Sequence, residues 1–513
     1  MNPQAPENVS PQPAELARMA SIFILQKEAY AHAPMPTLEE RKQHLVALRT
    51  LLIEYKHAIA EAISTDFTAR SVDETLLAEI MPCVHHIDYT LKRLRGWMEP
   101  GCRSIGLHFL PASARVVYQP LGVVGIIAPF NYPVNLSMLP LVTALAAGNR
   151  AMIKMSEHTP RTAMMIRKML HKSFAEDHVA LVTGDTDIAA AFSRLPFDHL
   201  LFTGSTRIGK LVMREAAKNL TPVTLELGGK SPAIIADDIP LEHIMDRLCF
   251  AKSLNAGQTC VAPDYVLIPR AKLEAFFRLY KAAFQKMFPT INGNADYTSI
   301  VNARTHQVLQ DWLKDAAEKG ARIEAVSDEI ISDGTFRMPL HLVTQVTGEM
   351  KIMQQELFGP ILSVIPYDQM DEALAYVRQR PRPLALYLFS YDTELQNRVT
   401  LNTHAGSMCI NDALIHLGVD DLPFGGIGPS GMGQYHGHEG FLTMSKAKSV
   451  MRKGRLNSMK FIYPPYGRRC RVGGCRLAQR RIACAHRTAF RVLGSGRQPA
   501  RTHSLRCDTW MRR

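Results

Sequence analysis

The feature that most constrains the fold is a regular alternation of short β-rich runs and helical segments, which begins near Arg115. Turn residues bound the β-rich runs, and the segments between them carry apolar residues at helical spacing. The predicted strands are residues 116–118, 123–127, 151–154, 178–182, 199–202 and 223–225, and the predicted helices are residues 136–147, 159–171 and 208–218. This alternation predicts βαβ units, and therefore an α/β fold with a parallel sheet.

Long amphipathic helices are predicted before this region. Thr37 and Glu40 have the spacing of a capping box, and apolar residues then recur at helical spacing as far as Ile59. A second helix is predicted from about residue 72 to 97. Later helices are predicted at residues 241–255, 273–287 and 305–319. Residues 1–13 are rich in proline and polar residues, which predicts disorder.

One cysteine has a setting that suits a nucleophile. Cys260 follows a turn that contains Gly257, and it precedes a predicted strand at residues 265–268. A thiolate is intrinsically nucleophilic, and this position would present it on rigid backbone. The alternative is a structural cysteine, because free cysteines often serve as small core hydrophobes.

Two polar residues are candidate partners for the cysteine. Glu226 lies between two leucines at the end of a β-type run. A buried carboxylate is costly unless it is paired or used, so a raised pKa and a general-base role are one hypothesis, and a solvated strand-end glutamate is the other. Asn131 follows the strand at residues 123–127 and could donate its amide to an oxyanion, or it could be an ordinary turn residue before proline.

A phosphate-binding turn is also a candidate. The sequence GSTRIG at residues 204–209 lies between a predicted strand and a predicted helix, where free backbone N–H groups could face a phosphate. The alternative is an ordinary helix start that is capped by Ser205 or Thr206. A GxGxxG string occurs only at residues 426–431, where the strand-to-helix context of the usual dinucleotide fingerprint is missing.

Five motifs together resemble the aldehyde dehydrogenase superfamily, over roughly residues 14–450. In chain order they are APFNYP (128–133), FTGSTRIG (202–209), TLELGGKS (224–231), SLNAGQTC (253–260) and ELFGP (356–360). Each motif alone is modest evidence, but five in the right order make a specific pattern. The segment PFGGIGPSGMGQYHG at residues 423–437 is most similar to the class-3 branch of that family.

The resemblance implies an aldehyde dehydrogenase fold, with a Rossmann-like cofactor lobe, an α/β catalytic lobe and a small β arm for oligomerisation. The expected boundaries are residues 14–228 for the N-terminal helices and NAD-binding lobe, with arm strands near 114–119, 229–409 for the catalytic lobe, and 410–450 for the substrate-channel loop and arm. A homodimer is expected.

The resemblance also implies a reaction, in which NAD oxidises an aldehyde to a carboxylic acid through a thiohemiacetal and a thioester on Cys260. Asn131 would stabilise the oxyanion, Glu226 would activate water, and no metal would be needed. The implied cofactor residues are Lys154, Glu157, Gly204, Ser205, Thr206, Gly209, Glu356 and Phe358, and the implied pocket residues are Tyr132 and Phe424.

The resemblance bears on the choice of cofactor and of substrate as well. Lys154 and Glu157 match the family's ribose-binding motif, where a carboxylate favours NAD and repels the 2′-phosphate of NADP. Met155 replaces the family's proline, so acceptance of NADP is a second expectation. The expected substrate is a phenylpropenoid aldehyde, with oxidation of coniferyl aldehyde to ferulate, and the alternative is a general class-3-like enzyme for medium-chain aliphatic or benzylic aldehydes.

The positive charge is concentrated at the end of the chain. Residues 467–513 carry 13 arginines, no lysine and one acidic residue, so almost all of the formal net charge of +13 lies there. The enzyme body is therefore nearly neutral, which argues against a nucleic-acid partner. This tail departs from the family, and our hypothesis is a disordered product of a shifted reading frame or a fusion. A basic anchor for anionic partners is the alternative.

Other bulk features favour a cytoplasmic enzyme. No run of about 18 apolar residues predicts a membrane span, and the first residues lack the pattern of a signal peptide. The nine cysteines include no CxxC pair, so neither a zinc site nor a disulfide framework is predicted. A thiol hydrolase built on Cys260 would need a histidine base, for which the sequence offers no matching context.

Overall fold

The computed structural model describes residues 12–457 and 463–464. The predictions for residues 1–11 and for the basic tail at residues 467–513 lie outside this part of the chain. The described residues divide into two units, of which the larger combines the chain up to Gly101 with Val116–Ser449, and the smaller contains Cys102–Arg115 and the chain from Val450 onward. All the candidate site residues belong to the larger unit.

Helices dominate the first hundred residues. They are α1 (Gln12–His32), α2 (Leu38–Asp66), α3 (Val72–Thr75) and α4 (Met81–Met98). The capping box of Thr37 and Glu40 is confirmed at the start of α2. Residues 12 and 13, expected to be disordered, instead begin α1, because a proline is compatible with the first turn of a helix. Among the described helices, none has both the length and the apolar composition that a membrane crossing requires.

The single helix predicted over residues 72–97 is interrupted. A π-helical turn, η1 (Leu76–Ile80), separates α3 from α4. Pro82 has no N–H to donate to the carbonyl of residue 78, so it lies where the regular α-helical hydrogen-bond pattern cannot continue. Two acidic residues are buried here in the larger unit, Glu74 in α3 and Glu79 in the π-helical turn.

The predicted parallel sheet is confirmed as a six-stranded sheet. Its strands are β3 (Val123–Ile127), β4 (Arg150–Lys154), β5 (Val179–Val182), β6 (His199–Gly204), β7 (Val223–Leu227) and β15 (Gly431–Met432). The spatial order is β15-β7-β6-β3-β4-β5, and only β15 runs antiparallel to its neighbour. The five parallel strands have the doubly wound order: the chain adds β4 and β5 on one side of β3, and then β6 and β7 on the other side.

The strand register brings the candidate residues to one edge of this sheet. Ile127 at the end of β3 pairs with Lys154 at the end of β4, and Thr203 in β6 pairs with Glu226 in β7. In open parallel sheets, ligands bind beyond the carboxyl ends of the strands at the point where the strand order reverses. The candidate site therefore lies where this fold class binds its ligands.

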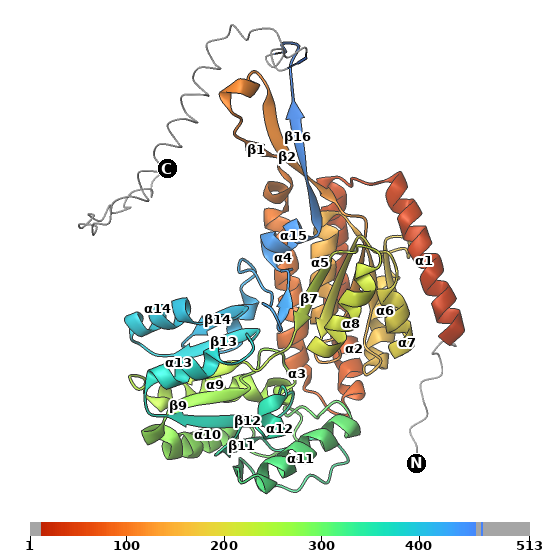
Figure 1. The fold of residues 1–513 in the computed structure, drawn as a ribbon. Helices are drawn as coiled ribbons and strands as arrows, with labels where there is room; N and C mark the ends of the chain where they lie inside the picture. Colours follow the sequence, from red (N-terminus) through yellow and green to blue (C-terminus); the bar gives the residue numbers. More distant parts are fainter. Residues whose placement is uncertain (1–11, 458–462, 465–513) are drawn as a thin grey trace, which may run out of the picture. The chain divides into compact units, whose positions relative to one another are not determined.

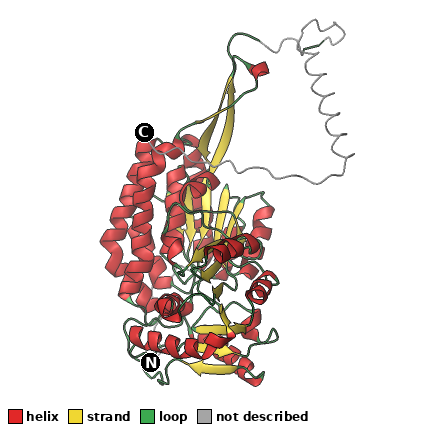
Figure 2. Cartoon of the chain, turned by 90° about the vertical axis from the view of Figure 1, so that its left-hand side faces the viewer, coloured by secondary structure: helices red, strands yellow, loops and turns green. Residues whose placement is uncertain are grey.

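Helices cover both faces of the six-stranded sheet. On one face α2, α4, α5 (Asn135–Ala147) and α6 (Pro160–Leu170) share a core with alternate residues of β3 and β4. On the other face α1, α7 (Thr186–Ser193) and α8 (Thr206–Ala217) pack on the remaining residues of those strands. Figure 2 shows the long helices side by side along the strands. Because both faces are buried, the strands are continuously apolar.

A second sheet of seven strands follows. Its spatial order is β10-β11-β12-β9-β8-β13-β14, and only β10 is antiparallel. The strands are β8 (Pro232–Ile235), β9 (Tyr265–Pro269), β10 (Arg322–Ala325), β11 (His341–Thr344), β12 (Ile361–Tyr367), β13 (Ala385–Phe389) and β14 (Ser407–Ile410). The helices are α9 (Met245–Ser253), α10 (Leu273–Met287), α11 (Ala303–Glu318), α12 (Lys351–Gln354), α13 (Met370–Arg378) and α14 (Thr393–Asn402). Figure 1 labels these elements apart from β8 and β10.

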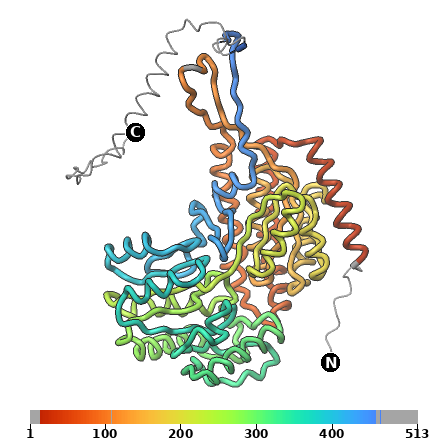
Figure 3. The backbone as a smooth tube through the Cα atoms, viewed as in Figure 1, coloured from red at the N-terminus to blue at the C-terminus, as the bar shows by residue number. Residues whose placement is uncertain are grey.

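The glycine-rich segment at residues 423–437 returns to the first sheet, as the blue tube of Figure 3 shows. Its strand β15 pairs with β7, so that Gly431 lies opposite Glu226. The segment then enters α15 (Gly437–Thr443) and β16 (Ser445–Arg452). A separate three-stranded sheet has the order β1-β2-β16, where β1 is Gly101–Arg103 and β2 is Ser113–Pro120.

Gly431 gives a test of how closely this loop must approach β7. A Cβ on Gly431 would lie 2.1 Å from the Leu225 carbonyl oxygen, and its φ of +142° is one that other residues rarely adopt. We expect Gly431→Ala to lower the free energy of unfolding by about 1–3 kcal/mol and to reduce kcat, because β15 must move away from β7. Thermal denaturation and steady-state kinetics measure both effects. Gly418→Ala is the control, since nothing lies within 4 Å of its Cβ; equal behaviour of the two variants would contradict the expectation.

Candidate active site

Three elements bring the candidate catalytic residues together. Asn131 lies in the turn between β3 and α5, and Glu226 is the penultimate residue of β7. Cys260 lies in the loop between a short 3₁₀ turn, η4 (Leu254–Gly257), and β9. The loop therefore enters from the seven-stranded sheet, whereas the amide and the carboxylate come from the six-stranded sheet.

The cysteine loop is held in one conformation by side-chain amides. Asn255 and Ala256 have left-handed backbone, with φ of 53° and 50°. The Gln258 amide donates to the carbonyl oxygens of Asn255 and Ser299, each at 3.0 Å, and its Oε1 accepts from the N–H of Val301 at 3.0 Å. This anchored loop presents the half-buried Cys260 on rigid backbone.

Glu226 is a buried carboxylate with no hydrogen-bond partner. Its side chain is almost fully buried, and neither carboxylate oxygen has a hydrogen-bond partner within the described residues. Burial raises its pKa well above the ordinary value, because a buried negative charge loses its hydration. A carboxyl group in this state is suited to accept a proton from water or from a thiol.

The thiol of Cys260 lies close to two acidic side chains. Burial, followed by the charges of Glu356 and Glu226, raises its pKa to about 12, while its own N–H and that of Val261 act in the opposite direction. The thiol is therefore protonated at neutral pH. Nucleophilic attack requires a base, or a change that removes nearby negative charge.

Asn131 has the geometry of an amide donor beside the cysteine loop. It is buried, and its Nδ2 donates one hydrogen to the Gln258 carbonyl oxygen at 3.0 Å. A primary amide has a second hydrogen, which has no acceptor within the described part of the chain. That hydrogen and the N–H of Cys260 are the two donors that an oxyanion on the cysteine's adduct could use.

The residues expected to bind the adenine ribose follow β4. Lys154 is buried, and its pKa is lowered by burial against the opposing effect of Glu157. Glu157 lies in the turn just beyond, where its side chain is 34% exposed. A buried ammonium next to a reachable carboxylate is a donor and acceptor pair that suits hydroxyl groups.

The GSTRIG turn leads directly into α8. Ser205 caps the helix by accepting the N–H of Ile208 at 3.4 Å, and the Thr206 hydroxyl donates to the Pro429 carbonyl oxygen at 3.1 Å. A Cβ on Gly209 would lie 2.6 Å from Leu227, so this glycine allows α8 to approach β7 closely. A Cβ on Gly204 would likewise lie 2.6 Å from Phe202.

Glu356 reaches back to β7 from the seven-stranded sheet. Its carboxylate lies against Gly228, where a Cβ would come within 1.9 Å of it, and Oε1 has no hydrogen-bond partner within the described residues. Burial and the neighbouring Asp264 raise its pKa to about 8. The ring of Phe358 is 5.8 Å from that of Phe130, between their centroids. Glu356, which lies against Gly228, is therefore just beyond the end of β7.

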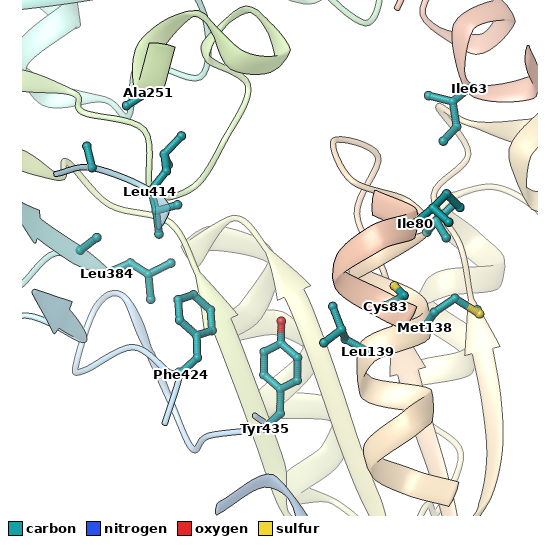
Figure 4. Close-up of a cluster of buried hydrophobic side chains, with 14 of the residues drawn as sticks. Ile63, Ile80, Cys83, Met138, Leu139, Ala251, Leu384, Leu414, Phe424 and Tyr435 are labelled. Atoms are coloured by element: carbon teal, nitrogen blue, oxygen red, sulfur yellow. The ribbon is translucent and has the colours of Figure 1, made fainter. Parts of the chain in front are cut away.

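The two expected pocket residues, Tyr132 and Phe424, are both buried. The hydroxyl of Tyr132 is 2.8 Å from the Thr259 hydroxyl. Phe424 is buried with Tyr435 in the same loop, with ring centroids 6.0 Å apart. Figure 4 shows the rings of Phe424 and Tyr435 in one buried cluster, with Leu139 next to Tyr435. The charges of Glu226 and Cys260 raise the pKa of Tyr435 after burial, which places its phenol near both.

Sequence reasoning missed a set of residues that hold the site in place. They are Arg70, Glu74 and Glu79 near the turn of Asn131, and Lys230, Lys252 and Asp264 near Glu356. Lys230 pairs with Asp264, whose Oδ2 accepts the N–H of Leu357 at 2.7 Å, and so the loop of Glu356 is fixed. The only sequence signal was a set of charged residues within apolar segments.

Comparison with known proteins identifies the family. The model of the aldehyde dehydrogenase family matches residues 18–450, and the chain belongs to that family. A protein named "Probable coniferyl aldehyde dehydrogenase" from Pseudomonas aeruginosa is 56% identical over 454 residues, which are 88% of this chain and 95% of that protein. The protein is thus an aldehyde dehydrogenase, an oxidoreductase.

Two further relatives agree with this assignment. The coniferyl aldehyde dehydrogenase of Pseudomonas sp. strain HR199 is 40% identical over 89% of this chain and 95% of its own length. The substrate-bound structure of Staphylococcus aureus AldH has a TM-score of 0.84 and 35% identity, and the match covers 90% of this chain and 99% of that one. The expected aldehyde dehydrogenase fold and the class-3-like resemblance are confirmed.

Proposed function

We propose that this protein oxidises a phenylpropenoid aldehyde, with coniferyl aldehyde as the specific substrate and NAD as the preferred cofactor, through covalent catalysis by Cys260. The observation that carries the mechanism is the buried Glu226, whose carboxylate has no hydrogen-bond partner in the described structure and whose charge acts on the Cys260 thiol. A base next to a nucleophile is the arrangement that such catalysis requires.

In the first step the sulfur of Cys260 attacks the aldehyde carbon, and the thiol proton passes to solvent. The carbonyl oxygen becomes an oxyanion of a thiohemiacetal. The free hydrogen of the Asn131 amide and the N–H of Cys260 then stabilise it, and each such donor contributes roughly 3 kcal/mol.

A dinucleotide held by the expected cofactor residues would supply the hydride acceptor, so that the thiohemiacetal carbon on Cys260 would be oxidised to a thioester. Glu226 then removes a proton from water as the water attacks the thioester. The tetrahedral adduct collapses, the carboxylic acid leaves, and the sulfur is free again. The raised pKa of Glu226 makes it a stronger base than an exposed glutamate, so that proton removal from water is easier.

The residues present fit a dinucleotide. The first turn of α8 offers backbone N–H groups to phosphate, and buried Lys154 and exposed Glu157 suit ribose hydroxyls. The unpartnered Oε1 of Glu356 could accept from the second ribose. The carboxylate of Glu157 supports NAD over NADP, because it would repel a 2′-phosphate.

The substrate proposal rests on the relatives and on the lining of the site. Two proteins named as coniferyl aldehyde dehydrogenases cover nearly the whole catalytic chain at 56% and 40% identity. Tyr132, Phe424 and Tyr435 offer aromatic surface on which a planar phenylpropenoid could pack. The expected homodimer, cytoplasmic location and domain boundaries stay predictions.

The test is the rate of NAD reduction by the purified protein with coniferyl aldehyde, benzaldehyde and hexanal, repeated with NADP. We expect the highest kcat/KM for coniferyl aldehyde with NAD. Equal values across the three aldehydes would support the alternative, a general class-3-like enzyme. No activity with any of them would contradict the mechanism as well as the substrate.

A further inference from the structure

A buried arginine lies directly behind the candidate oxyanion site. Arg70 lies between α2 and α3, and its side chain is 0% exposed. Its Nη1 donates to the main-chain carbonyl oxygen of Asn131 at 2.8 Å. The same oxygen accepts a second hydrogen bond from Asn255 Nδ2 at 2.9 Å. The peptide that carries the Asn131 amide is thus fixed from two sides.

Two glutamates extend the arginine's contacts to both halves of the site. Glu79 pairs with Arg70 at 3.1 Å, and its Oε2 accepts the N–H groups of Val134 and Asn135 at 2.7 and 3.1 Å. Those donors belong to the start of α5, which has no side-chain cap of its own. Glu79 therefore fixes the helix that begins just after Asn131.

Glu74 connects the arginine to the cysteine loop. Its Oε1 lies 3.3 Å from Arg70 Nε, and its Oε2 accepts the N–H of Asn255 at 3.1 Å. The hydroxyl of Thr298 donates to the same oxygen at 3.1 Å. Asn255 is the left-handed residue at which the cysteine loop turns, so Glu74 supports that turn.

The guanidinium also stacks on an aromatic ring of the site. Its Cζ is 4.9 Å from the centroid of the Tyr132 ring, and the Tyr132 hydroxyl contacts Thr259, the neighbour of Cys260. One cation therefore touches the Asn131 peptide, a carboxylate that holds the cysteine loop, and an aromatic residue of the pocket. Arginine suits this task because its planar fork makes several directed contacts, which lysine cannot match.

We infer that Arg70 is a positioning residue, which sets the distance between the Asn131 amide and Cys260 and so forms the oxyanion-binding geometry. This inference rests on the proposed function of Asn131 and Cys260. Arg70 does not touch the reacting atoms. It acts through the Asn131 peptide and, by way of Glu74, through Asn255. Displacement of a catalytic donor by about 1 Å is enough to slow a reaction by about 100-fold.

The test is Arg70→Lys in the full-length protein. We expect kcat/KM for the aldehyde to fall by about 10- to 100-fold, mostly in kcat, while the Kd for NAD stays within about twofold. The rate at which iodoacetamide alkylates Cys260 should also stay within about twofold, because the alkylation reaction forms no oxyanion. Cys260→Ala identifies the alkylated residue. A variant that was merely less well folded would lose all three properties together.

A double-mutant cycle tests whether Arg70 acts through Asn131. In the Asn131→Ala background, Arg70→Lys should change kcat by less than about twofold, because the donor that it positions is already gone. The matched control is Arg41→Lys. Arg41 is equally buried, but it donates to the carbonyls of Pro36 and Ala146, away from the site. Normalised to folded protein, this control should keep wild-type kcat.

Each result supports or overturns the inference. Additive effects of Arg70→Lys and Asn131→Ala, or parallel loss of alkylation and oxidation, would overturn it. If Arg70→Lys does not fold, a triple variant replaces it, in which all three buried charges are removed: Arg70→Gln, Glu74→Gln and Glu79→Gln. Wild-type kcat in the triple variant would overturn the inference equally. If Asn131→Ala is slow but Arg70→Lys is not, the inference fails alone. Full activity of Cys260→Ala or Asn131→Ala would instead contradict the proposed function.

Discussion

Replacement of Cys260 with alanine should lower aldehyde oxidation by at least about 10⁴-fold, because in the proposed mechanism the sulfur forms both covalent intermediates. Alanine leaves the loop intact, since the loop is anchored by Gln258 and Asn255 and not by the thiol. The variant should therefore keep the wild-type melting temperature and the wild-type affinity for NAD. The measurement is NADH formation, together with NAD binding by fluorescence titration.

Cys249→Ala is the matched control for this prediction. The thiol of Cys249 is buried in the same unit, and burial raises its pKa to about 12, the same value as for Cys260. Cys249 packs in the core next to Ser253, away from the acidic pair that acts on Cys260. Near-normal kcat in Cys249→Ala and none in Cys260→Ala would assign the chemistry to position 260. Residual oxidation above about 1% in Cys260→Ala would contradict the mechanism.

Most of the six-stranded sheet and several of its helices could be predicted because their signals are local, whereas α1, α7 and β15 were not predicted. Strands such as β3 and β4 are short apolar runs between turn residues, and the predicted bounds differ from the observed ones by at most two residues at each end. The alternation of strands and helices predicted the parallel sheet. The broken helix at residues 72–97 was missed, because apolar spacing continues through the π-helical turn and only Pro82 marks the interruption.

The site was only partly predictable, because its assembly depends on contacts between distant segments. The motifs named Asn131, Glu226 and Cys260, but not the hydrogen bond by which Asn131 contacts Gln258 across 127 positions. Arg70 was missed because a lone arginine between two helices is ordinarily a surface residue. Glu74 and Glu79 lie only four and nine residues further along the chain, but the sequence does not show that both are buried against the arginine. Lys252 was missed for the same reason, since its partner is the carbonyl of Leu357.

Replacement of Glu226 with glutamine should separate the two halves of the reaction. Hydride transfer consumes no water, so the first turnover should proceed and release about one NADH per active site. Thioester hydrolysis needs a base, and its loss should slow later turnovers by about 10²- to 10⁴-fold. Stopped-flow absorbance measures the burst, and intact-mass measurement of the trapped protein should find the acyl group on Cys260. If no burst is seen, Glu226 is needed to ionise the thiol first.

The pH profile distinguishes these roles of Glu226. Burial raises its pKa, so the carboxyl remains protonated to a higher pH than an exposed glutamate would. The base form exists only above that pKa, and hydrolysis in the wild-type protein should therefore slow as the pH falls through it. In Glu226→Gln this limb should disappear, because no titrating base remains. If the acidic limb survives in the variant, another group is the base. Glu356, whose pKa burial raises to about 8, is then the carboxyl to replace next.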